Sequence, residues 1–241
     1  MERLQKVIAT SGVCSRRKAE EKIINNKVKV NGKVINTLGF KVRQSDKIEV
    51  DDILIEKNKQ LYYILLNKPR AVVSTTKDEK NRKTVIDIIN IKERIYPVGR
   101  LDYDTTGLLL LTNDGDFANM LMHPSNKIDK VYIAKVKGIV TGYDVKRLKN
   151  GVIIDGKRTS EARVKLKSID KDKKVSIVEI TIHEGKNHQI KKMFSSLGLD
   201  VLKLKRTGYS FLTLDGVKVG EYRMLNQKEV KRLYSKNGGN I

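Results

Sequence analysis

A polar stretch at residues 51–60, DDILIEKNKQ, constrains the fold most, because it separates two regions with distinct helix and strand patterns. We expect it to link two separate cores. The chain of 241 residues has room for a small domain, residues 1–57, and a larger one, residues 58–241. A domain of about 150 residues buries roughly two-thirds of its unfolded surface, so neither disulfides nor metals are needed for stability.

The first domain is expected to consist of two short helices and a hairpin. Apolar residues at helical spacing precede Gly12, which ends the first helix. Ser15 can cap a second helix over residues 16–25, because its hydroxyl can accept from a free amide of the first turn. In VKVNGKVI, residues 28–35, the Asn-Gly pair is the strongest short-range hairpin signal, and a strand at 47–50 closes the unit.

The charge balance is the strongest global signal. Fifty Lys and Arg stand against 28 Asp and Glu, which gives a formal net charge of +22 and a pI near 9.9. Such an excess predicts a polyanionic partner, because each phosphate that a basic side chain neutralises releases condensed counterions. Basic chains also occur among proteins that bind nothing anionic, and a charged helix is usually only a solvated face. Charge therefore favours a nucleic acid without identifying it.

Basic side chains of the first domain gather on the second helix and the hairpin: Arg16, Arg17, Lys18, Lys22, Lys27, Lys29 and Lys33. The segments that carry them, SRRKAEEKI and VKVNGKV, resemble the small alpha-L RNA-binding domain that a small-subunit ribosomal protein shares with several RNA-modifying enzymes. This resemblance implies that the partner is structured RNA. It also implies that Arg16, Arg17, Lys18 and Lys22 contact the RNA.

Strand and helix patterns alternate after the linker. Strands are expected at residues 61–66, 130–136, 162–169, 175–182 and 201–205, and helices at 84–89, 117–122, 143–149, 187–197 and 227–234. Runs of strands with helices packed on one side are typical of an α+β domain around a mostly antiparallel sheet. The final residues, KNGGNI, are expected to fray.

Composition argues against several classes of site and location. Cys14 is the only cysteine, so no intramolecular disulfide can form and a reducing cytoplasm is expected. The three histidines, His123, His183 and His188, lie far apart in the sequence, which argues against structural zinc. The N-terminus lacks the apolar core of a signal peptide, and the most apolar run, residues 108–111, is too short to span a bilayer. We expect a cytoplasmic protein, and nothing suggests more than a monomer.

The most informative local motif is YPVGRLDYDTTGLLLLTNDG at residues 96–115. An apolar approach and a Gly-Arg turn lead to Asp102, and Asp104 follows before a run of leucines. A carboxylate beside an apolar strand can serve as acid, base or nucleophile, because burial and basic neighbours tune it. By composition alone, however, a turn aspartate that caps the next segment is the favoured interpretation.

The string as a whole nevertheless resembles the central motif of pseudouridine synthases that modify single uridines in bacterial ribosomal RNA, most closely the large-subunit type. Three further blocks fall in that family's order. LLNKPRAVVST (65–75) resembles its Lys-Pro motif, and DKVYIAKVKG (129–138) resembles the strand that carries its active-site tyrosine. HEGKNHQIKKMFSSLG (183–198), followed by LKLKRTGYSFLTL (202–214), resembles its closing motif. The likeness covers nearly the entire chain.

The resemblance implies a role for each matching residue. Asp102 would be the essential carboxylate, and Arg100 would enter the RNA stack when the target uridine flips out. Tyr132 would stack on the flipped uracil and assist loss of the proton from carbon 5. Lys191 would pair with Asp102, in a position where arginine, which pairs in a fork, is more usual. The motifs also imply RNA contacts for three further lysines: Lys68, Lys186 and Lys192.

The implied reaction conserves all atoms. The bond from nitrogen 1 of uracil to the ribose breaks, the ring rotates in place, and carbon 5 bonds to the same sugar carbon. No cofactor, metal or cosubstrate is therefore expected, in agreement with a sequence that has no phosphate loop or nucleotide fingerprint. The site must also exclude water, and residues 108–111, Leu202 and Leu204 would be its walls, although core packing explains them equally well.

Two alternatives stay open at this point. A non-catalytic RNA-binding or ribosome-assembly factor would share the charge and the alpha-L domain, but it would have no need to keep Asp102, Tyr132 and Lys191 together. A synthase for small-subunit ribosomal RNA would share the motifs, which separate the two branches poorly. The string DYDTTGLLLLTNDGDFANMLMHPS, residues 102–125, is closer to the large-subunit group.

Overall fold

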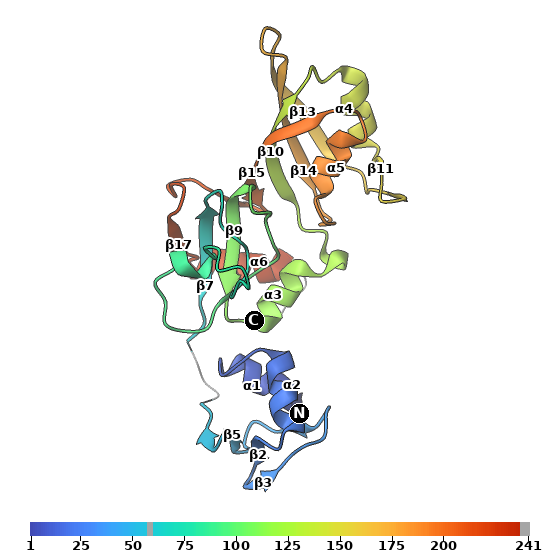
Figure 1. Ribbon diagram of the computed structural model, residues 1–241. Coiled ribbons are helices and arrows are strands. Elements are labelled where there is room, and N and C mark those ends of the chain that lie inside the picture. Colours follow the sequence, from blue (N-terminus) through green and yellow to red (C-terminus); the bar gives the residue numbers. More distant parts are fainter. Residues whose placement is uncertain (57–59, 237–241) are drawn as a thin grey trace. The chain divides into compact units, whose positions relative to one another are not determined.

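The computed structural model describes residues 1–56 and 60–236, and the chain divides into two compact units (Figure 1). Unit 1 comprises Met1–Tyr62, Ile91–Ile95 and Asn113–Gly115, and unit 2 comprises the rest. The domain boundary expected between residues 57 and 58 lies within residues 57–59, which are not described. No helix in the described part of the chain is long and apolar enough to cross a membrane.

Unit 1 combines two helices with short antiparallel strands. Its elements are β1 (Glu2–Arg3), α1 (Leu4–Thr10), α2 (Arg16–Ile24), β2 (Val28–Val30), β3 (Lys33–Val34), β4 (Lys41–Val42), β5 (Ile48–Val50) and β6 (Ile53–Leu54). Ser15 caps α2 as expected, because its hydroxyl accepts from the Lys18 amide at 3.2 Å. The hairpin at Asn31-Gly32 is also confirmed, as β2 and β3 of a sheet with order β3-β2-β5-β6.

Unit 2 is an α+β domain built on a nine-stranded mixed sheet. Its strands are β7 (Tyr63–Lys68), β8 (Tyr96–Pro97), β9 (Thr106–Thr112), β10 (Lys130–Lys137), β13 (Arg163–Asp170), β14 (Val175–Ile182), β15 (Asp200–Tyr209), β16 (Leu212–Thr213) and β17 (Tyr222–Met224). The main path runs β13-β14-β10-β15-β9-β7-β17, with β16 beside β15 and β8 beside β9. Its strand pairs are antiparallel except β15 with β9, so the expected mostly antiparallel sheet is confirmed.

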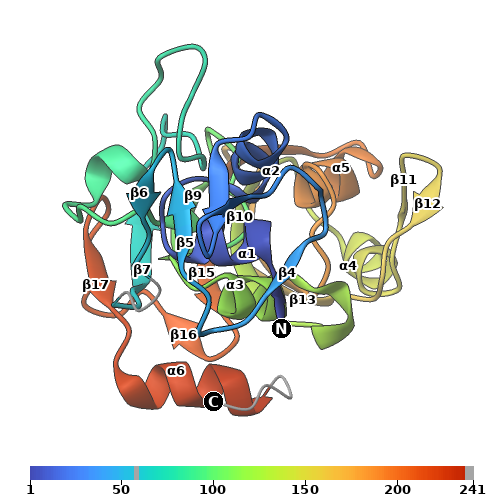
Figure 2. The same cartoon turned by 90° about the horizontal axis from the view of Figure 1, so that it is seen from below.

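Helices flank this sheet. They are α3 (Gly115–Met122), α4 (Gly142–Lys149), α5 (Gln189–Ser195) and α6 (Gln227–Lys236), with 3-10 turns at Ile86–Ile88 and Pro124–Asn126. A small hairpin of β11 (Ile153–Ile154) and β12 (Lys157–Arg158) follows α4. α4 packs against β13 and α5 against β15, and Figure 2 shows α6 beside β16.

Three sequence expectations for unit 2 need correction. The helix expected at 84–89 is a single 3-10 turn, because the Asp87 carboxylate accepts from the Thr84 amide at 2.7 Å and closes a tight turn instead. The helix expected at 187–197 begins only after His188, whose φ of 50° is left-handed. β15 runs to Tyr209, beyond the expected end at residue 205. From residue 237 on, the tail expected to fray lies outside the described residues.

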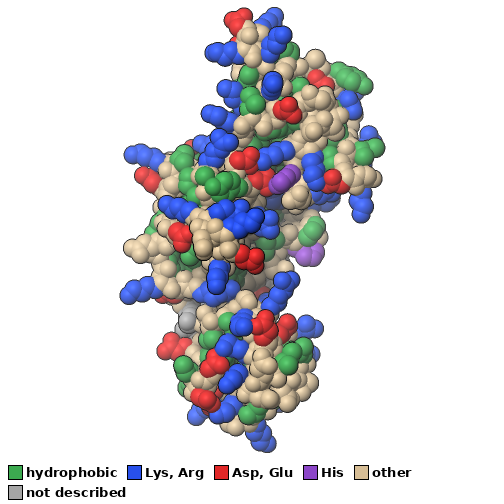
Figure 3. All heavy atoms as spheres, in the orientation of Figure 1, with side chains coloured by type: hydrophobic (Ala, Val, Ile, Leu, Met, Phe, Trp, Pro, Cys, Tyr) green, Lys and Arg blue, Asp and Glu red, His purple; other side chains and the backbone are tan. Residues whose placement is uncertain are grey.

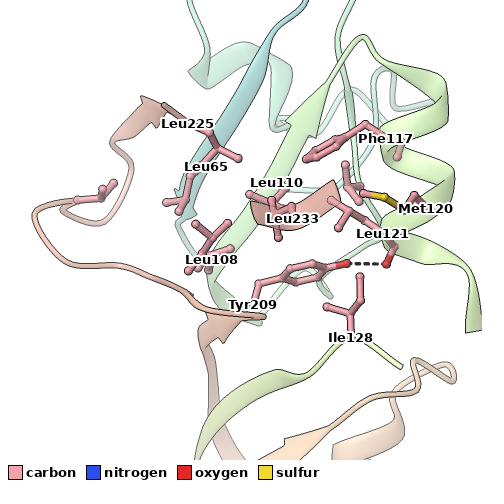
Figure 4. Packing of buried hydrophobic residues seen from close by; sticks show 14 residues of the cluster. Leu65, Leu108, Leu110, Phe117, Met120, Leu121, Ile128, Tyr209, Leu225 and Leu233 are labelled. Carbon is pink, nitrogen blue, oxygen red and sulfur yellow. Dashed lines mark hydrogen bonds between the residues drawn. The ribbon is translucent and has the colours of Figure 1, made fainter. Parts of the chain in front are cut away.

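One hydrophobic core joins β7 and β9 to α3 and α6 (Figure 4). Leu108 and Leu110 of the leucine run point into this core, which explains them without any role in the active site. Tyr209 is buried in the same cluster, and its hydroxyl donates to the Leu121 carbonyl at 2.8 Å. That bond satisfies the polar end of an otherwise apolar side chain.

Gly107 allows β9 to approach β15 closely. Its φ is +105°, and a Cβ at this position would lie 2.1 Å from the carbonyl oxygen of Arg206. Any side chain would therefore force the two strands apart. Because Asp102 and Asp104 come just before β9, this close pairing holds the start of the strand and the turn in front of it.

Candidate active site

Asp102 lies in a tight turn directly before β9. The Thr105 amide donates to the Asp102 carbonyl at 3.1 Å, which leaves the two residues between them exposed. On the other side, the Ser74 hydroxyl donates to the Leu101 carbonyl at 2.9 Å and accepts from the Leu101 amide at 3.2 Å. The bond within the turn and the bonds from Ser74 to Leu101 together hold the Asp102 backbone in one position.

Two basic side chains of the 183–198 segment face Asp102. Lys191 Nζ lies 3.4 Å from Asp102 Oδ2 and 2.6 Å from Asp104 Oδ1. His188 Nε2 lies 3.4 Å from Asp102 Oδ1. Lys191 therefore lies between two carboxylates, and its hydrogen bond goes to Asp104 rather than to Asp102.

Asp104 holds the Lys191 ammonium in this place. Burial raises the pKa of Asp104, but the hydrogen bond and charge of Lys191, together with the charge of Arg70, outweigh burial and bring the pKa below its ordinary value. Asp104 is thus ionised at neutral pH. A fixed anion at this point keeps the cation beside Asp102.

The loop before α5 is held by Gln189. Its side-chain oxygen accepts from the Lys186 amide at 2.9 Å, and its side-chain nitrogen donates to Glu184 Oε1 at 2.5 Å. Glu184 also accepts from the Ser160 amide at 2.9 Å. His188 precedes Gln189 in the left-handed region, which is uncommon for a residue other than glycine, and its ring lies beside Asp102.

A cavity of about 90 Å³ opens beside Asp102. It is lined by apolar and polar side chains together: Arg100, Leu101, Asp102, Thr105, Tyr132, Ile182, Lys186, His188, Gln189, Ile190, Lys191 and Leu204. Tyr132 of β10 is only 8% exposed, and the Arg206 guanidinium lies 6.0 Å from its ring centroid. An aromatic ring, apolar walls and one carboxylate thus converge on a small space that suits a flat polar ring. Of the expected walls, Leu204 lines the cavity, whereas Leu202 is half exposed and does not.

Comparison with known proteins identifies the family. Residues 62–196 match the family described as RNA pseudouridylate synthase, and residues 2–48 match the S4 domain. The chain is 56% identical over 234 residues to the ribosomal large subunit pseudouridine synthase B of Bacillus subtilis, across 97% of this chain and 96% of that protein. The chain belongs to the RNA pseudouridylate synthase family.

Two further comparisons agree. A dual-specificity RNA pseudouridine synthase of Escherichia coli O6:H1 is 37% identical over 234 residues, which cover 96% of this chain and 78% of that protein. A crystal structure described as a pseudouridylate synthase matches with a TM-score of 0.69 and 31% identity, over 97% of this chain and all of the other. This pseudouridine synthase therefore has a solved structural relative along nearly its entire length.

Lys68 of the synthase does not lie where RNA can touch it. The side chain is fully buried, and its ammonium donates to the carbonyls of Pro69 at 3.0 Å and Thr105 at 2.9 Å. Burial lowers the pKa of Lys68 to about 8, although the charges of Asp104 and Asp102 oppose this. The expectation of an RNA contact is therefore wrong. Lys68 instead ties the Lys-Pro motif to the turn that carries Asp102.

The other basic residues of the motifs differ in their surroundings. Arg100 is exposed at the cavity. Lys186 also lines it, but its ammonium donates to the Arg158 carbonyl at 3.2 Å. Lys192 points to the β11–β12 hairpin, where it pairs with Asp155 at 2.5 Å. Arg100 and Lys186 thus border the cavity directly, whereas Lys192 does not line it and is paired with Asp155.

The basic residues of α2 in the S4 domain also divide into two kinds. Lys18 pairs with Glu21 at 2.6 Å, and Lys22 pairs with Asp51. Arg16 and Arg17 are exposed, and neither has an ion pair among the residues that the structure describes. The two arginines are therefore the cations of α2 that are most available to phosphates.

Sequence reasoning missed three features of this synthase. His188 was identified only as part of the closing motif, and its left-handed backbone, which brings it to Asp102, has no sequence signal. The Asp-Tyr-Asp spacing could be seen in the sequence, but the hydrogen bond from Lys191 to Asp104 could not be predicted from it. Thr105 Oγ1, buried at the cavity, has no hydrogen-bond partner among the described residues. Those residues also contain no group of three or more His, Cys, Asp or Glu side chains arranged to hold a metal.

Proposed function

We propose that this synthase converts one specific uridine of large-subunit ribosomal RNA to pseudouridine, with Asp102 as its catalytic carboxylate. The position of Asp102 carries the proposal: it faces Lys191 and His188 and borders the cavity whose wall is Tyr132. The large subunit is favoured because 56% identity to the Bacillus subtilis enzyme extends along nearly the whole of both chains.

The target base has to leave the RNA stack before its glycosidic bond can meet Asp102. The uracil would enter the cavity and lie against the Tyr132 ring, with Ile182 and Leu204 on the apolar sides. Arg100, exposed at the same cavity, would take the place of the extruded base in the stack. A guanidinium suits that position because it is planar and cationic.

The chemistry then needs one carboxylate and an enclosed space. The bond between nitrogen 1 and the ribose breaks, the uracil turns within the cavity, and carbon 5 bonds to the same sugar carbon. Carbon 5 loses a proton and nitrogen 1 gains one, so substrate and product are isomers. Asp102 would assist the exchange of the nitrogen 1 bond for the carbon 5 bond at the ribose. Tyr132 would assist loss of the proton from carbon 5. Apolar walls limit the water that would hydrolyse the detached intermediate.

Lys191 would act on this reaction through its position between the two carboxylates. Its ammonium lies 3.4 Å from Asp102, close enough for an attractive charge interaction even though the hydrogen bond goes to Asp104. Asp104 would keep the Lys191 ammonium in place while the charge on Asp102 changes during the reaction. Lys191 thus orients and stabilises the carboxylate without transferring a proton itself.

The S4 domain would deliver the RNA. We assign it to residues 1–57 and the catalytic domain to residues 58–241. Arg16 and Arg17 would contact phosphates, joined by Lys18 and Lys22 when their ion pairs open. Since ribosomal RNA is a cytoplasmic substrate in bacteria, the enzyme would work in the cytoplasm, as a monomer. It would need no cofactor, because the reaction conserves all atoms.

Mapping pseudouridines in ribosomal RNA from cells with and without the gene tests the proposal. One pseudouridine should disappear from large-subunit RNA on deletion and return with the wild-type gene but not with the Asp102→Asn gene. Loss of a small-subunit site instead would contradict the choice of subunit. An unchanged map, with altered assembly of ribosomal particles, would favour the non-catalytic alternative.

A further inference from the structure

A second, larger hollow lies next to the active-site cavity within unit 2. It has a volume of about 450 Å³, against about 90 Å³ for the cavity at Asp102. Four residues line both spaces: Arg100, Leu101, Asp102 and His188. The remaining lining comes from the segment between β7 and the Ile86–Ile88 turn, and from Tyr103. The second space therefore lies beside any group that is placed at Asp102.

Tyr103 presents an aromatic ring to the hollow. Its side chain is 46% exposed even though both of its sequence neighbours belong to the Asp102 turn. The backbone behind it is fixed, because the Ala71 amide donates to the Tyr103 carbonyl at 2.9 Å. An exposed ring on a fixed backbone loses little conformational freedom when a flat ligand stacks on it.

Arg82 lies beside this ring in a prearranged position. Its guanidinium carbon is 5.8 Å from the Tyr103 ring centroid. The Asp78 carboxylate accepts from Arg82 Nη2 at 2.7 Å and Nε at 3.1 Å, and from the backbone amides of Arg82 at 2.9 Å and Lys80 at 3.1 Å. These bonds hold the pKa of Asp78 well below its usual range. Asp78 thus organises the loop while its own charge is compensated.

The rest of the lining favours an anion. Lys77 and Lys80 are exposed on the same loop, and Arg100 adds a third cation. The acids of the lining that are not tied to Arg82 are Glu79 and Asp102. Figure 3 shows Lys and Arg side chains bordering acidic and histidine side chains on one face of unit 2. The hollow therefore combines an exposed aromatic ring with several cations, which is the composition that binds a nucleotide of single-stranded RNA.

We propose that this hollow binds the nucleotide next to the target uridine, with its base on the Tyr103 ring and its phosphate near Arg82 and Lys80. The proposal rests on the proposed function, because it places the target itself at Asp102. Arg100 borders both spaces, so an arginine that fills the stack also separates the flipped uridine from its neighbour. Stacking on a tyrosine accepts any base, whereas the fixed guanidinium can prefer one with acceptor atoms at its edge.

Affinities of the full-length protein for modified RNA fragments test the subsite. The probes are an RNA fragment carrying the mapped uridine, and copies in which each flanking nucleotide in turn is abasic. The wild type should lose about 5- to 150-fold in affinity at one flanking position, the range for one base on one aromatic ring. Tyr103→Ala should lose affinity for the intact RNA by a similar factor. On the copy that is abasic at that position it should bind like the wild type, because both changes remove the same contact.

A matched control is available on α4. Tyr143 is 70% exposed and has the Arg147 guanidinium carbon 5.8 Å from its ring centroid, as in the Tyr103–Arg82 pair, but it lines neither space. Tyr143→Ala should bind every RNA like the wild type. Tyr103→Phe, which keeps the ring, should also do so. Should Tyr103→Ala fail to fold by circular dichroism, Tyr103→Leu provides the same comparison.

The outcomes separate the two proposals. Pseudouridine formation in the intact fragment by the wild type tests the proposed function alone. Two results with an active wild type would show that the subsite does not exist. Either Tyr103→Ala binds the intact RNA with normal affinity, or its loss of affinity adds to the loss caused by an abasic nucleotide at every flanking position. If the wild type binds the fragment but forms no pseudouridine in it, the proposed function fails, and the same binding series still decides whether a base stacks on Tyr103.

Discussion

Replacement of the buried Lys68 by methionine should change how stability depends on pH. Lys68 is fully inaccessible to solvent, and burial lowers its pKa from 10.5 to about 8. This difference corresponds to at most about 3 kcal/mol of preference for the neutral amine in the folded protein. The unfolded chain keeps its proton up to pH 10.5, whereas the folded protein releases it near pH 8. Between these values the unfolded state binds more protons, so wild-type stability rises with pH, and this gain is lost as pH falls through about 8.

The methionine variant lacks that gain. At neutral pH it avoids the cost of a buried ammonium, but it leaves the Pro69 and Thr105 carbonyls without a donor, at about 1–3 kcal/mol each. The two effects are of similar size, so stability near pH 7 should change little. The difference in unfolding free energy, wild type minus Lys68→Met, should then grow by about 1.4 kcal/mol per pH unit above pH 8.

Urea unfolding followed by circular dichroism at several pH values from about 7 to 10 measures this difference. Lys137→Met, at an exposed position at the end of β10, controls for the loss of one lysine. Turnover by Lys68→Met should also fall, because the turn that carries Asp102 loses its tie to the Lys-Pro motif. Stability curves that run parallel in wild type and Lys68→Met would refute the assigned effect of burial.

Four further predictions concern the roles of the two domains. Asp102→Asn should abolish turnover while fold and RNA binding stay nearly intact, and activity within about tenfold of wild type would contradict its role. A fragment lacking residues 1–57 should bind RNA more weakly yet melt cooperatively, and an unfolded fragment would show that the boundary is misplaced. Replacing Arg16 and Arg17 by alanine should flatten the slope of log affinity against log salt by about 0.7–0.9 for each phosphate that the protein no longer neutralises. Tyr132→Phe should slow turnover at saturating RNA and leave that slope unchanged.

Features that depend on residues close together in the chain could be predicted from sequence. The Asn31-Gly32 hairpin and the Ser15 cap follow from local backbone preferences, and both are present. The four motifs identified the family because each is a contiguous string, and the family match covers residues 62–196. The prediction that Asp102 is the catalytic carboxylate comes from the same motif, since its neighbours in sequence carry the signal. Local chemistry was sufficient for these conclusions.

Only the tertiary structure decided how these residues meet. Lys191 hydrogen-bonds Asp104, 87 positions away in sequence, because α5 and the turn before β9 come together in the fold. In the sequence nothing distinguishes Lys68 from a surface lysine, but the packing of β7 against β9 buries it. Tyr103 and Arg82 lie beside each other because Ser74 fastens their loop to Leu101 and Asp78 holds Arg82 in place within that loop. Burial and side-chain pairing arise from contacts between distant segments, so no pattern within one segment specifies them.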